Sequence, residues 1–205
     1  MSFDYFGSHP GVYQAVCITR AEVAARALAA TAGLPTRYKL GMGGRNPGAT
    51  HPAPMMACDC SGFSAWATGH DRRQYAAGHR LADKVTGEMW YDTRTIVNDA
   101  KARTHLIYAV VMRTEEVVPG MLLVYSPDEA NLPYGHVGVI TKVKDGFVRG
   151  RVKPGEEWWR FLEVTDCSTG RGATAIRTRP NARLWSAEKR GGYIVQNIRN
   201  VVDGE

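Results

Sequence analysis

Hydrophobic and polar positions change their spacing about halfway along the chain. In the first half, apolar residues recur at helical spacing, and the alanine-rich segment 20–32 is predicted to be a helix. Thr19 and Glu22 have the spacing of a capping box at its start, while Gly33 and Pro35 end it. Three of its residues are expected to face the core, namely Val23, Ala27 and Leu28.

A second predicted helix begins at or just before Cys60 and is ended by Gly69. A residue without a Cβ enters the left-handed conformation at little cost, which suits the position after a helix end. Phe63, Trp66 and Ala67 lie three and four residues apart, so they share one apolar face. We therefore expect that face to anchor the helix against the core, with Cys60 at the N-terminus.

The second half of the chain has the pattern of a sheet. A short helix is predicted over 94–102, started by a cap at Asp92 or Thr93. From Leu106 onward, short runs of Val, Ile, Leu, Tyr and Trp are separated by turn residues, which is typical of strands. Strands are predicted at 106–112, 121–126, 136–143, 147–152, 158–167, 173–178 and 193–198.

The order of these elements predicts the fold class. Asp145 and Gly146 separate two of the apolar runs and form the strongest hairpin signal in the sequence. Helices that precede an antiparallel sheet define the α+β class, in which the central helix lies on the sheet. No internal repeat and no low-complexity linker divides the 205 residues, so we expect a single domain over 1–205.

The charge balance limits the classes of partner. The net charge is +6 and the isoelectric point is about 9.2, which favours an anionic partner such as nucleic acid, a membrane surface or a cell-wall polymer. The basic residues are spread along the chain without a dense run or a nucleic-acid-binding motif, so no nucleic-acid partner is expected. No segment has the length of a membrane span, so no integral membrane association is expected.

The N-terminal residues lack the basic region and the apolar run of a signal peptide. We therefore expect a protein that is made in the cytoplasm. If it acts outside that compartment, another machinery has to deliver it.

Cysteine carries the first candidate chemistry. Four thiols are too few for a disulfide scaffold, and neither a second Cys pair nor a nearby His completes a zinc pattern, so no metal or cofactor is expected. Cys60 differs from the other three because the unpaired N–H groups and the positive dipole end of a helix stabilise a thiolate. The alternative is that Cys60 is a small buried hydrophobic residue. The other cysteines are Cys17, Cys58 and Cys167.

His136 is the candidate general base for Cys60. The other five histidines fall in loops or at the ends of elements, whereas His136 begins a predicted strand. Gly135 and Gly138 leave room for a helix N-terminus to approach that strand closely. A neutral imidazole there would accept the thiol proton and form an ion pair with the thiolate. A solvent-exposed histidine at a strand end is the alternative.

Asp166 is the candidate partner of that histidine. It lies near the middle of an apolar strand, where an unpaired carboxylate costs several kcal/mol. We therefore expect Asp166 to bind His136 on a neighbouring strand and to orient its ring. Strand alternation places Ser168 on the same face, as the next candidate, and directs Cys167 away from the site.

Four segments, in order, carry a resemblance to a known family. Residues 59–63 resemble the D-C-S-G signature of NlpC-type cell-wall peptidases, which are papain-like cysteine hydrolases of bacteria and phages. Residues 38–47 resemble the Tyr, Gly-Gly and Pro positions that precede the cysteine in that family. Residues 118–125 are similar to its Pro-Gly-Asp-Leu strand, and 135–139 are similar to its His-Val-Gly strand. The resemblance runs over about 38–178.

The resemblance implies a papain-like α+β fold and a cysteine peptidase or amidase that cleaves an amide bond of peptidoglycan. Cys60 would be the nucleophile, His136 the base and Asp166 the third member of the triad. The amide would lie in the stem peptide, for instance between a γ-linked D-glutamyl residue and a diamino acid, in the cross-link, or between stem and sugar. Because the sequence shows neither a signal peptide nor a separate wall-binding domain, we expect an enzyme of this kind to be phage-encoded or injected by a secretion machine.

The resemblance also implies substrate-binding residues. Tyr38 would donate to the oxyanion together with the backbone N–H of Cys60, while Asp59 and Ser61 would cap the helix and shape the groove. The third residue of the family is often His, and Asp166 in its place is similar to the related CHAP amidases. The segment 71–116 is longer than in the compact form of the family and is expected to be an insertion that builds part of the groove.

Several other functions are compatible with the same residues. One is a binding or structural module, for instance a virion or phage-tail component, that keeps the fold without turnover. A second is a redox or metal protein that uses the thiols of Cys58 and Cys60. A third is an acyltransferase or an amidase with a substrate outside the cell wall. The bond cut and the oligomeric state are left open by the sequence.

Overall fold

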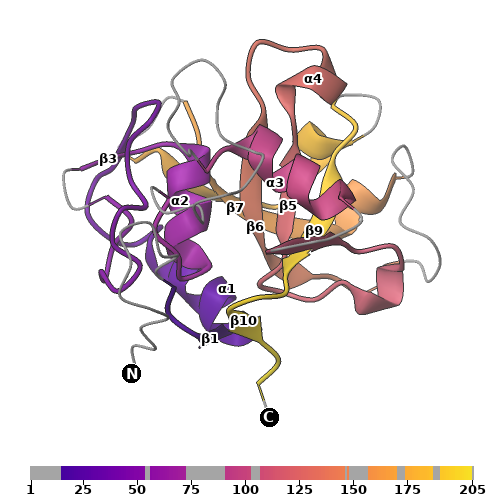
Figure 1. Cartoon of the computed structure of the whole chain (residues 1–205), viewed down its shortest axis with the longest axis horizontal. Coiled ribbons are helices and arrows are strands. Elements are labelled where there is room, and N and C mark those ends of the chain that lie inside the picture. Colours follow the sequence, from indigo (N-terminus) through magenta and orange to yellow (C-terminus); the bar gives the residue numbers. More distant parts are fainter. Residues whose placement is uncertain are drawn as a thin grey trace.

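The computed structural model describes residues 15–53, 56–72, 91–102, 107–145, 147, 157–169, 174–186 and 190–204. Helices and strands are mixed in it, so the fold is α+β, as the sequence predicts (Figure 1). The helices are α1 (Arg20–Ala29), α2 (Cys60–Ala67), α3 (Thr93–Lys101) and α4 (Pro127–Ala130). Short 3₁₀ segments are η1 (Thr114–Glu116), η2 (Glu157–Phe161) and η3 (Arg183–Trp185).

A six-stranded antiparallel sheet forms the centre of the described structure, in the order β4-β9-β5-β6-β7-β8. Its strands are β4 (Tyr108–Val110), β5 (Leu122–Tyr125), β6 (His136–Val143), β7 (Leu162–Cys167), β8 (Ile176–Arg179) and β9 (Tyr193–Asn197). Figure 1 shows α1 and α2 lying against this sheet near β6 and β7. The predicted arrangement of the Cys60 helix on an antiparallel sheet is therefore present.

Two short parallel ladders lie outside the main sheet. They join β1 (Ile18–Thr19) to β10 (Val201–Val202), and β2 (Arg37–Tyr38) to β3 (Ala57–Cys58). Each strand has only two residues, too few for the period-two alternation that reveals a strand in a sequence. The β2–β3 ladder matters for the site because β3 leads directly into α2.

Hydrophobic side chains form one cluster on each face of the main sheet. Strand alternation explains this division, because Leu122 and Val124 belong to the cluster under the helices, whereas Leu123 and Tyr125 belong to the other. The helix-side cluster contains Phe63 and the other apolar residues of α2. The opposite cluster is built around tryptophan side chains. The sheet is thus covered by hydrophobic side chains on both faces.

Helix α2 is buried over its whole length. Its N-cap is Asp59, whose side chain accepts from the backbone N–H of Gly62, and Gly69 follows its end with φ of 76°. The predicted start at Cys60 and the predicted glycine stop are both confirmed. Because every side of the helix contacts protein, the position of Cys60 is fixed relative to the sheet.

Helix α1 carries one correction. The capping box of Thr19 and Glu22 is present, and Val23 and Ala27 are buried as predicted. Leu28, which was expected in the core, is 44% exposed. Successive helical residues are about 100° apart, so Leu28 is turned away from the stripe that Val23 and Ala27 bury. The helix also ends at Ala29, short of the predicted end at residue 32.

The predicted helix at 94–102 is observed as α3, with Asp92 as its cap. The predicted strand 136–143 is observed over the same residues as β6, and those at 106–112, 121–126 and 193–198 are observed within these limits. The predicted strand 173–178 begins later, as β8. The strand at 147–152, apart from Phe147, and the turn residue Gly146 lie outside the described residues.

The predicted strand 158–167 is wrong in its first part, which forms η2 before β7 begins at Leu162. Trp158 and Trp159 both pack on the cluster opposite the helices. Neighbouring residues of a strand point to opposite faces, so a strand would separate these two rings. The 3₁₀ turn keeps both of them on the same side.

Asn200 connects the C-terminal segment to the far end of α2. Its Nδ2 donates to the carbonyl of Val16 at 3.0 Å and to that of Thr68, the C-cap residue of α2, at 2.6 Å. Its Oδ1 accepts from Asn197 at 2.8 Å. The orphan carbonyl at the end of α2 is thereby satisfied by a side chain from the last strand region. Among the described residues, no helix is both long and apolar enough to cross a membrane.

Candidate active site

Asp59 organises the chain around the start of α2. Its Oδ1 accepts from the Gly62 N–H at 2.7 Å and from the Ser61 hydroxyl at 3.0 Å. Its Oδ2 accepts from the Gly41 N–H at 2.6 Å, which holds the incoming loop against the helix. A carboxylate at a helix N-terminus is favoured by the helix dipole and by the unpaired N–H groups. Asp59 is therefore the cap that the sequence predicts.

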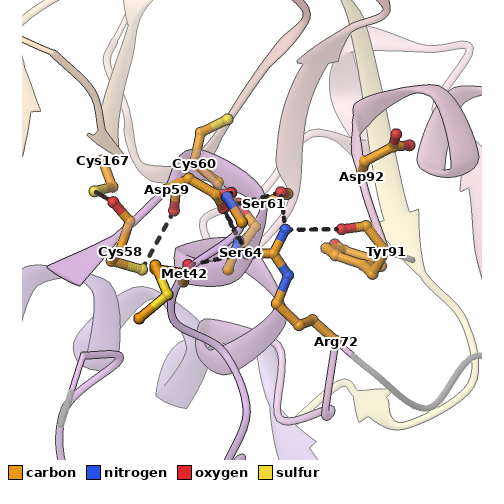
Figure 2. A network of polar contacts seen from close by, with 12 residues as sticks. Met42, Cys58, Asp59, Cys60, Ser61, Ser64, Arg72, Tyr91, Asp92 and Cys167 are labelled. Carbon is orange, nitrogen blue, oxygen red and sulfur yellow. Dashed lines mark hydrogen bonds and ion pairs between the residues drawn. The ribbon is translucent and has the colours of Figure 1, made fainter. Parts of the chain in front are cut away.

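Arg72 completes this network from the opposite side and is fully buried. Its Nη1 donates to Asp59 Oδ1 at 2.8 Å and to the Met42 carbonyl at 2.9 Å. Its Nη2 donates to the Ser61 hydroxyl at 2.9 Å and reaches the Tyr91 carbonyl at 3.4 Å. Figure 2 shows the guanidinium surrounded by these groups, with the Cys60 side chain directed away from it. Arg72 thus fixes Asp59 and the preceding loop without occupying the space in front of the thiol.

Glycines let the preceding loop touch the helix. Gly44 has φ of +66°, and a Cβ there would lie 2.3 Å from the Gly62 carbonyl oxygen. A Cβ on Gly43 would lie 2.2 Å from Cys58 Sγ, so that thiol is covered by the loop. The backbone N–H of Asp59 donates to the Met42 carbonyl at 3.0 Å. The loop is therefore held to the helix by backbone contacts as well as by Arg72.

Replacement of Gly44 by Ala is expected to lower the free energy of unfolding by about 3 kcal/mol. A left-handed backbone costs an L-residue about 1–2 kcal/mol, and forced overlap in a packed region adds typically about 1–3 kcal/mol. Gly191→Ala is the matched control, because Gly191 has φ of +65° and nothing within 4 Å of its added Cβ. Urea unfolding of both variants measures the difference. Equal losses in the two variants would contradict the close approach of loop and helix.

Cys60, the first residue of α2, is buried next to His136 and Tyr38. The ring of His136 points its Nε2 at Asp166 Oδ2, 2.7 Å away, which leaves Nδ1 for the thiol. The ring stacks on Trp185, with centroids 5.3 Å apart and planes at 27°. The contact predicted between His136 and Asp166 is present, and packing on an indole holds the imidazole in one orientation.

The electrostatics of His136 favour its protonated form. Burial alone would lower its pKa, but the negative charge at Cys60 and the hydrogen bond to Asp166 raise the pKa to about 9. At neutral pH the ring therefore carries a proton that it shares with these two partners. A cysteine beside an imidazolium, at the positive end of a helix, has the surroundings of a reactive thiolate.

Asp166 is fully buried and binds side chains from both neighbouring strands, His136 of β6 and Arg179 of β8. Arg179 of β8 donates through Nε to Oδ2 at 2.7 Å, and the Ser168 hydroxyl lies 3.3 Å from Oδ1. Burial would raise the pKa of Asp166, but His136 first and Arg179 second lower it below the usual range. The carboxylate therefore stays ionised and holds the proton of His136 on Nε2. Cys167, the next residue, donates to the Cys58 carbonyl at 3.3 Å.

Tyr38 lies beside the thiol and keeps its proton. Burial first and the charge at Cys60 second raise the pKa of its phenol. A phenol that stays protonated is a hydrogen-bond donor at every physiological pH. Tyr38 is held by the β2–β3 ladder, in which it pairs with Cys58.

The structure brings together the predicted Cys60, His136, Asp166 and Tyr38, and it places Asp59 and Ser61 behind them on Arg72. The predicted role of Asp59 as the N-cap of α2 is confirmed. That a substrate contacts Asp59, Ser61 or Tyr38 stays a prediction. Both Asp59 and Ser61 are buried. Their part in the site is thus to shape the helix start.

Sequence reasoning missed two arginines and misjudged one histidine. Arg72 and Arg179 were counted in the spread positive charge, yet each one donates to a buried carboxylate. The sequence signal for these cations is the carboxylates themselves, Asp59 next to Cys60 and Asp166 in an apolar strand, because a buried carboxylate needs a partner. His70, expected in a loop or at the end of an element, does follow the far end of α2. It is nevertheless fully buried, with Thr68 Oγ1 2.9 Å from its Nδ1, and burial lowers its pKa to about 3.

Comparison with known proteins gives little beyond these observations. No protein-family model matches the sequence, and no curated protein matches it. Among solved structures, the chain is similar to NlpC1 from Trichomonas vaginalis, with 18% identity and a TM-score of 0.38 over 87% of this chain. The chain spans 43% of that neighbour's length. Within the described residues, no cluster of three His, Cys, Asp or Glu side chains is placed to hold a metal ion.

Proposed function

We propose that the protein is a cysteine hydrolase that cleaves amide bonds. The observation that supports this most is the sequence of contacts from Cys60 at a helix N-terminus to His136, and from His136 Nε2 to the buried carboxylate of Asp166 at 2.7 Å. Nucleophile, base and orienting acid in this order are what acyl transfer requires.

The proposed reaction uses these groups in two stages. The Cys60 thiolate attacks the amide carbonyl, and the oxyanion is stabilised by the Cys60 backbone N–H and the Tyr38 hydroxyl. Imidazolium Nδ1 of His136 protonates the leaving amine as the C–N bond breaks, which leaves a thioester on Cys60. His136 then removes a proton from water, which attacks the thioester and restores the thiolate. Asp166 keeps the Nε2 proton in place throughout.

We propose peptidoglycan as the substrate on the strength of the four segments that resemble NlpC-type peptidases. The bond would lie in the stem peptide or between stem and sugar, and the enzyme would reach the wall by phage or secretion-dependent delivery. In this proposal the chain is one papain-like catalytic domain, and the segment 71–116 is an insertion that contributes Arg72. The opposite directions of the Cys58 and Cys60 side chains argue against a redox pair (Figure 2).

Digestion of purified peptidoglycan sacculi tests this function. The wild-type protein is expected to release fragments that mass spectrometry identifies, and Cys60→Ala is expected to release none, a loss of at least roughly a thousandfold. Cys17→Ala, which removes an exposed thiol, is the matched control and should keep full activity.

The fragments also separate the rival functions. Products that incorporate an added amine would identify an acyltransferase instead of a hydrolase. No fragments from the folded wild-type protein would contradict the proposal and favour a binding module or an amide outside the wall. Equal digestion by wild type and Cys60→Ala would exclude Cys60 as the nucleophile.

A further inference from the structure

One oxygen of Asp166 binds both a histidine and an arginine. Oδ2 lies 2.7 Å from Nε2 of His136 on β6 and 2.7 Å from Nε of Arg179 on β8. A second donor of Arg179, Nη2, binds the Ser168 hydroxyl at 2.9 Å, and that hydroxyl lies 3.3 Å from Asp166 Oδ1. Arg179 therefore contacts the carboxylate directly and also through Ser168, and these contacts fix the plane of its guanidinium.

The register of three neighbouring strands creates this arrangement. Asp166 on β7 is directly opposite Gly138 on β6 and Arg177 on β8. His136 and Arg179 stand two positions away from those partners, so they are diagonal neighbours on the same face, within reach of long side chains. A Cβ on Gly138 would lie 3.2 Å from that of Asp166, so a side chain there would crowd the carboxylate. The sheet thus presents Asp166 to one residue on each side.

Arg179 balances the charge of the buried site. In the proposed reactive form, the thiolate of Cys60, the imidazolium of His136 and the carboxylate of Asp166 sum to one negative charge. The side chains of His136 and Asp166 are 9% and 0% exposed, and that of Arg179 is 27% exposed. An uncompensated charge in such surroundings is costly. Arg179 brings the sum of the four groups to zero.

The groups that face His136 come from several elements packed around it. They are Cys60 of α2, Asp166 of β7, Tyr125 of β5 with Arg190 over its ring, and Trp185 of η3. Burial raises the pKa of Tyr125, so its phenol stays neutral, and the indole of Trp185 does not titrate. The charges that raise the pKa of His136 are those of Cys60 and Asp166. The charge of Asp166 is in turn opposed by Arg179.

The proposed reaction needs His136 both to hold a proton and to release it. As an imidazolium it protonates the leaving amine, and as a neutral imidazole it removes a proton from water in the second stage. A carboxylate bound to Nε2 alone would favour the imidazolium strongly and slow the second stage. Because Arg179 binds the same oxygen, its positive charge weakens this preference.

We propose that Arg179 is a positioning residue of the proposed active site, one that shares Oδ2 of Asp166 with His136 and thereby limits how firmly the carboxylate retains the imidazolium. The inference rests on the proposed function, because the limit matters only if His136 has to release its proton during turnover. The predicted triad becomes a row of four groups with alternating charge, which starts at Cys60 and ends at Arg179.

Titration of His136 by NMR tests this role without a substrate. Protein labelled with ¹⁵N in its six histidines gives ring-nitrogen signals for each of them, and the signals that disappear in His136→Gln are those of His136. In Arg179→Met the pKa of His136 should rise by about one unit, because a positive charge that opposed the imidazolium has been removed. Arg179→Lys keeps that charge, so its His136 should titrate closer to the wild-type value.

Two further variants separate this effect from a structural one. Arg177→Met is the matched control, because Arg177 lies on the same face of β8 and donates to the Ser168 hydroxyl at 3.1 Å, and it should shift the pKa of His136 much less. Asp166→Asn should lower that pKa, in the direction opposite to Arg179→Met. A loosened site would instead move the pKa toward the ordinary value of about 6.5 in both variants.

Turnover gives a second measurement. A rise of one unit in the pKa reduces the neutral fraction of His136 about tenfold at neutral pH, so water should attack the thioester more slowly in Arg179→Met. An acyl group should therefore accumulate on Cys60 during digestion of sacculi, visible in the intact mass of the protein. The alkaline limb of activity should move to higher pH than in the wild type.

The outcomes separate the role of Arg179 from the function. A pKa of His136 in folded Arg179→Met that is equal to or below the wild-type value would overturn the proposal. If Arg179→Met does not fold, Arg179→Gln, which keeps an N–H donor without the charge, gives the same comparison with the same expected rise. Sacculi that wild type leaves intact, or that Cys60→Ala digests equally well, would overturn the proposed function, whereas the titration of His136 would still measure the effect of Arg179.

Discussion

Asp166→Asn is expected to lower turnover by roughly three to four orders of magnitude while the protein stays folded. The neutral amide no longer stabilises the charged imidazole, and it can present an N–H group to Nε2 in place of an acceptor. His136 then loses both the orientation and the tautomer that direct Nδ1 at the thiol. The shape of the side chain is retained, so the protein should still fold.

The pH dependence of the same variant distinguishes this role from a purely structural one. In the wild type, His136 has a pKa of about 9, so the imidazolium that protonates the leaving amine is lost as the pH rises through that value. Activity should therefore fall on the alkaline side near pH 9. The Asp166 hydrogen bond is one of the causes that raise this pKa. In Asp166→Asn the alkaline limb should move to lower pH.

Ser168→Ala is the matched control, because the Ser168 hydroxyl contacts the other carboxylate oxygen of Asp166 at 3.3 Å. Ser168→Ala should keep most of the activity, and its activity should fall at the same alkaline pH as that of the wild type. Unchanged turnover in Asp166→Asn would show that Asp166 is not the third catalytic residue. A large loss in Ser168→Ala would then transfer that role to Ser168.

Arg72→Met is expected to lower the free energy of unfolding by about 3–5 kcal/mol, the usual result of removing one partner of a buried ion pair. The Asp59 carboxylate would stay buried without its cation, and the carbonyl of Met42 would lose a donor at 2.9 Å. The cap of α2 and the loop before it would loosen together. Urea unfolding measures the stability, and the iodoacetamide rate at Cys60 reports the change at the site.

Two further variants show whether the loss comes from the unpaired charge. The double variant Arg72→Met with Asp59→Asn should recover part of the stability, since it removes the buried charge as well. Arg94→Met breaks an exposed pair with Asp128 and should shift the unfolding midpoint little. A loss in Arg72→Met no greater than in Arg94→Met would contradict the structural role of Arg72.

The local patterns of the sequence were sufficient for the parts of the site that depend on a single element. The start of α2 at Cys60 follows from a cap and a glycine stop, and the face of β7 on which Asp166 lies follows from strand alternation. Both are short-range rules that tertiary packing did not override here. The exposed Leu28 shows the limit of such rules, because an alanine-rich helix leaves the width of its buried stripe undefined.

The rest of the site could not be predicted, because it depends on contacts between distant segments. Arg72 reaches Met42 across 30 positions in the chain, and Arg179 reaches Asp166 across 13 positions, from the neighbouring strand. An arginine in a basic chain has no sequence feature that marks it as buried. The two-residue ladders of β1 with β10 and β2 with β3 were invisible for a similar reason.

Asn200 implies an order of events in folding. Its hydrogen bond to Thr68 joins residues 132 positions apart, so the far end of the helix that bears Cys60 is completed only when the last strand region is in place. Contacts of such high sequence separation form late, because a long loop has to close first. During synthesis, α2 therefore leaves the ribosome well before the side chain that caps it. The surroundings of Cys60 should be complete only after synthesis has proceeded as far as Asn200.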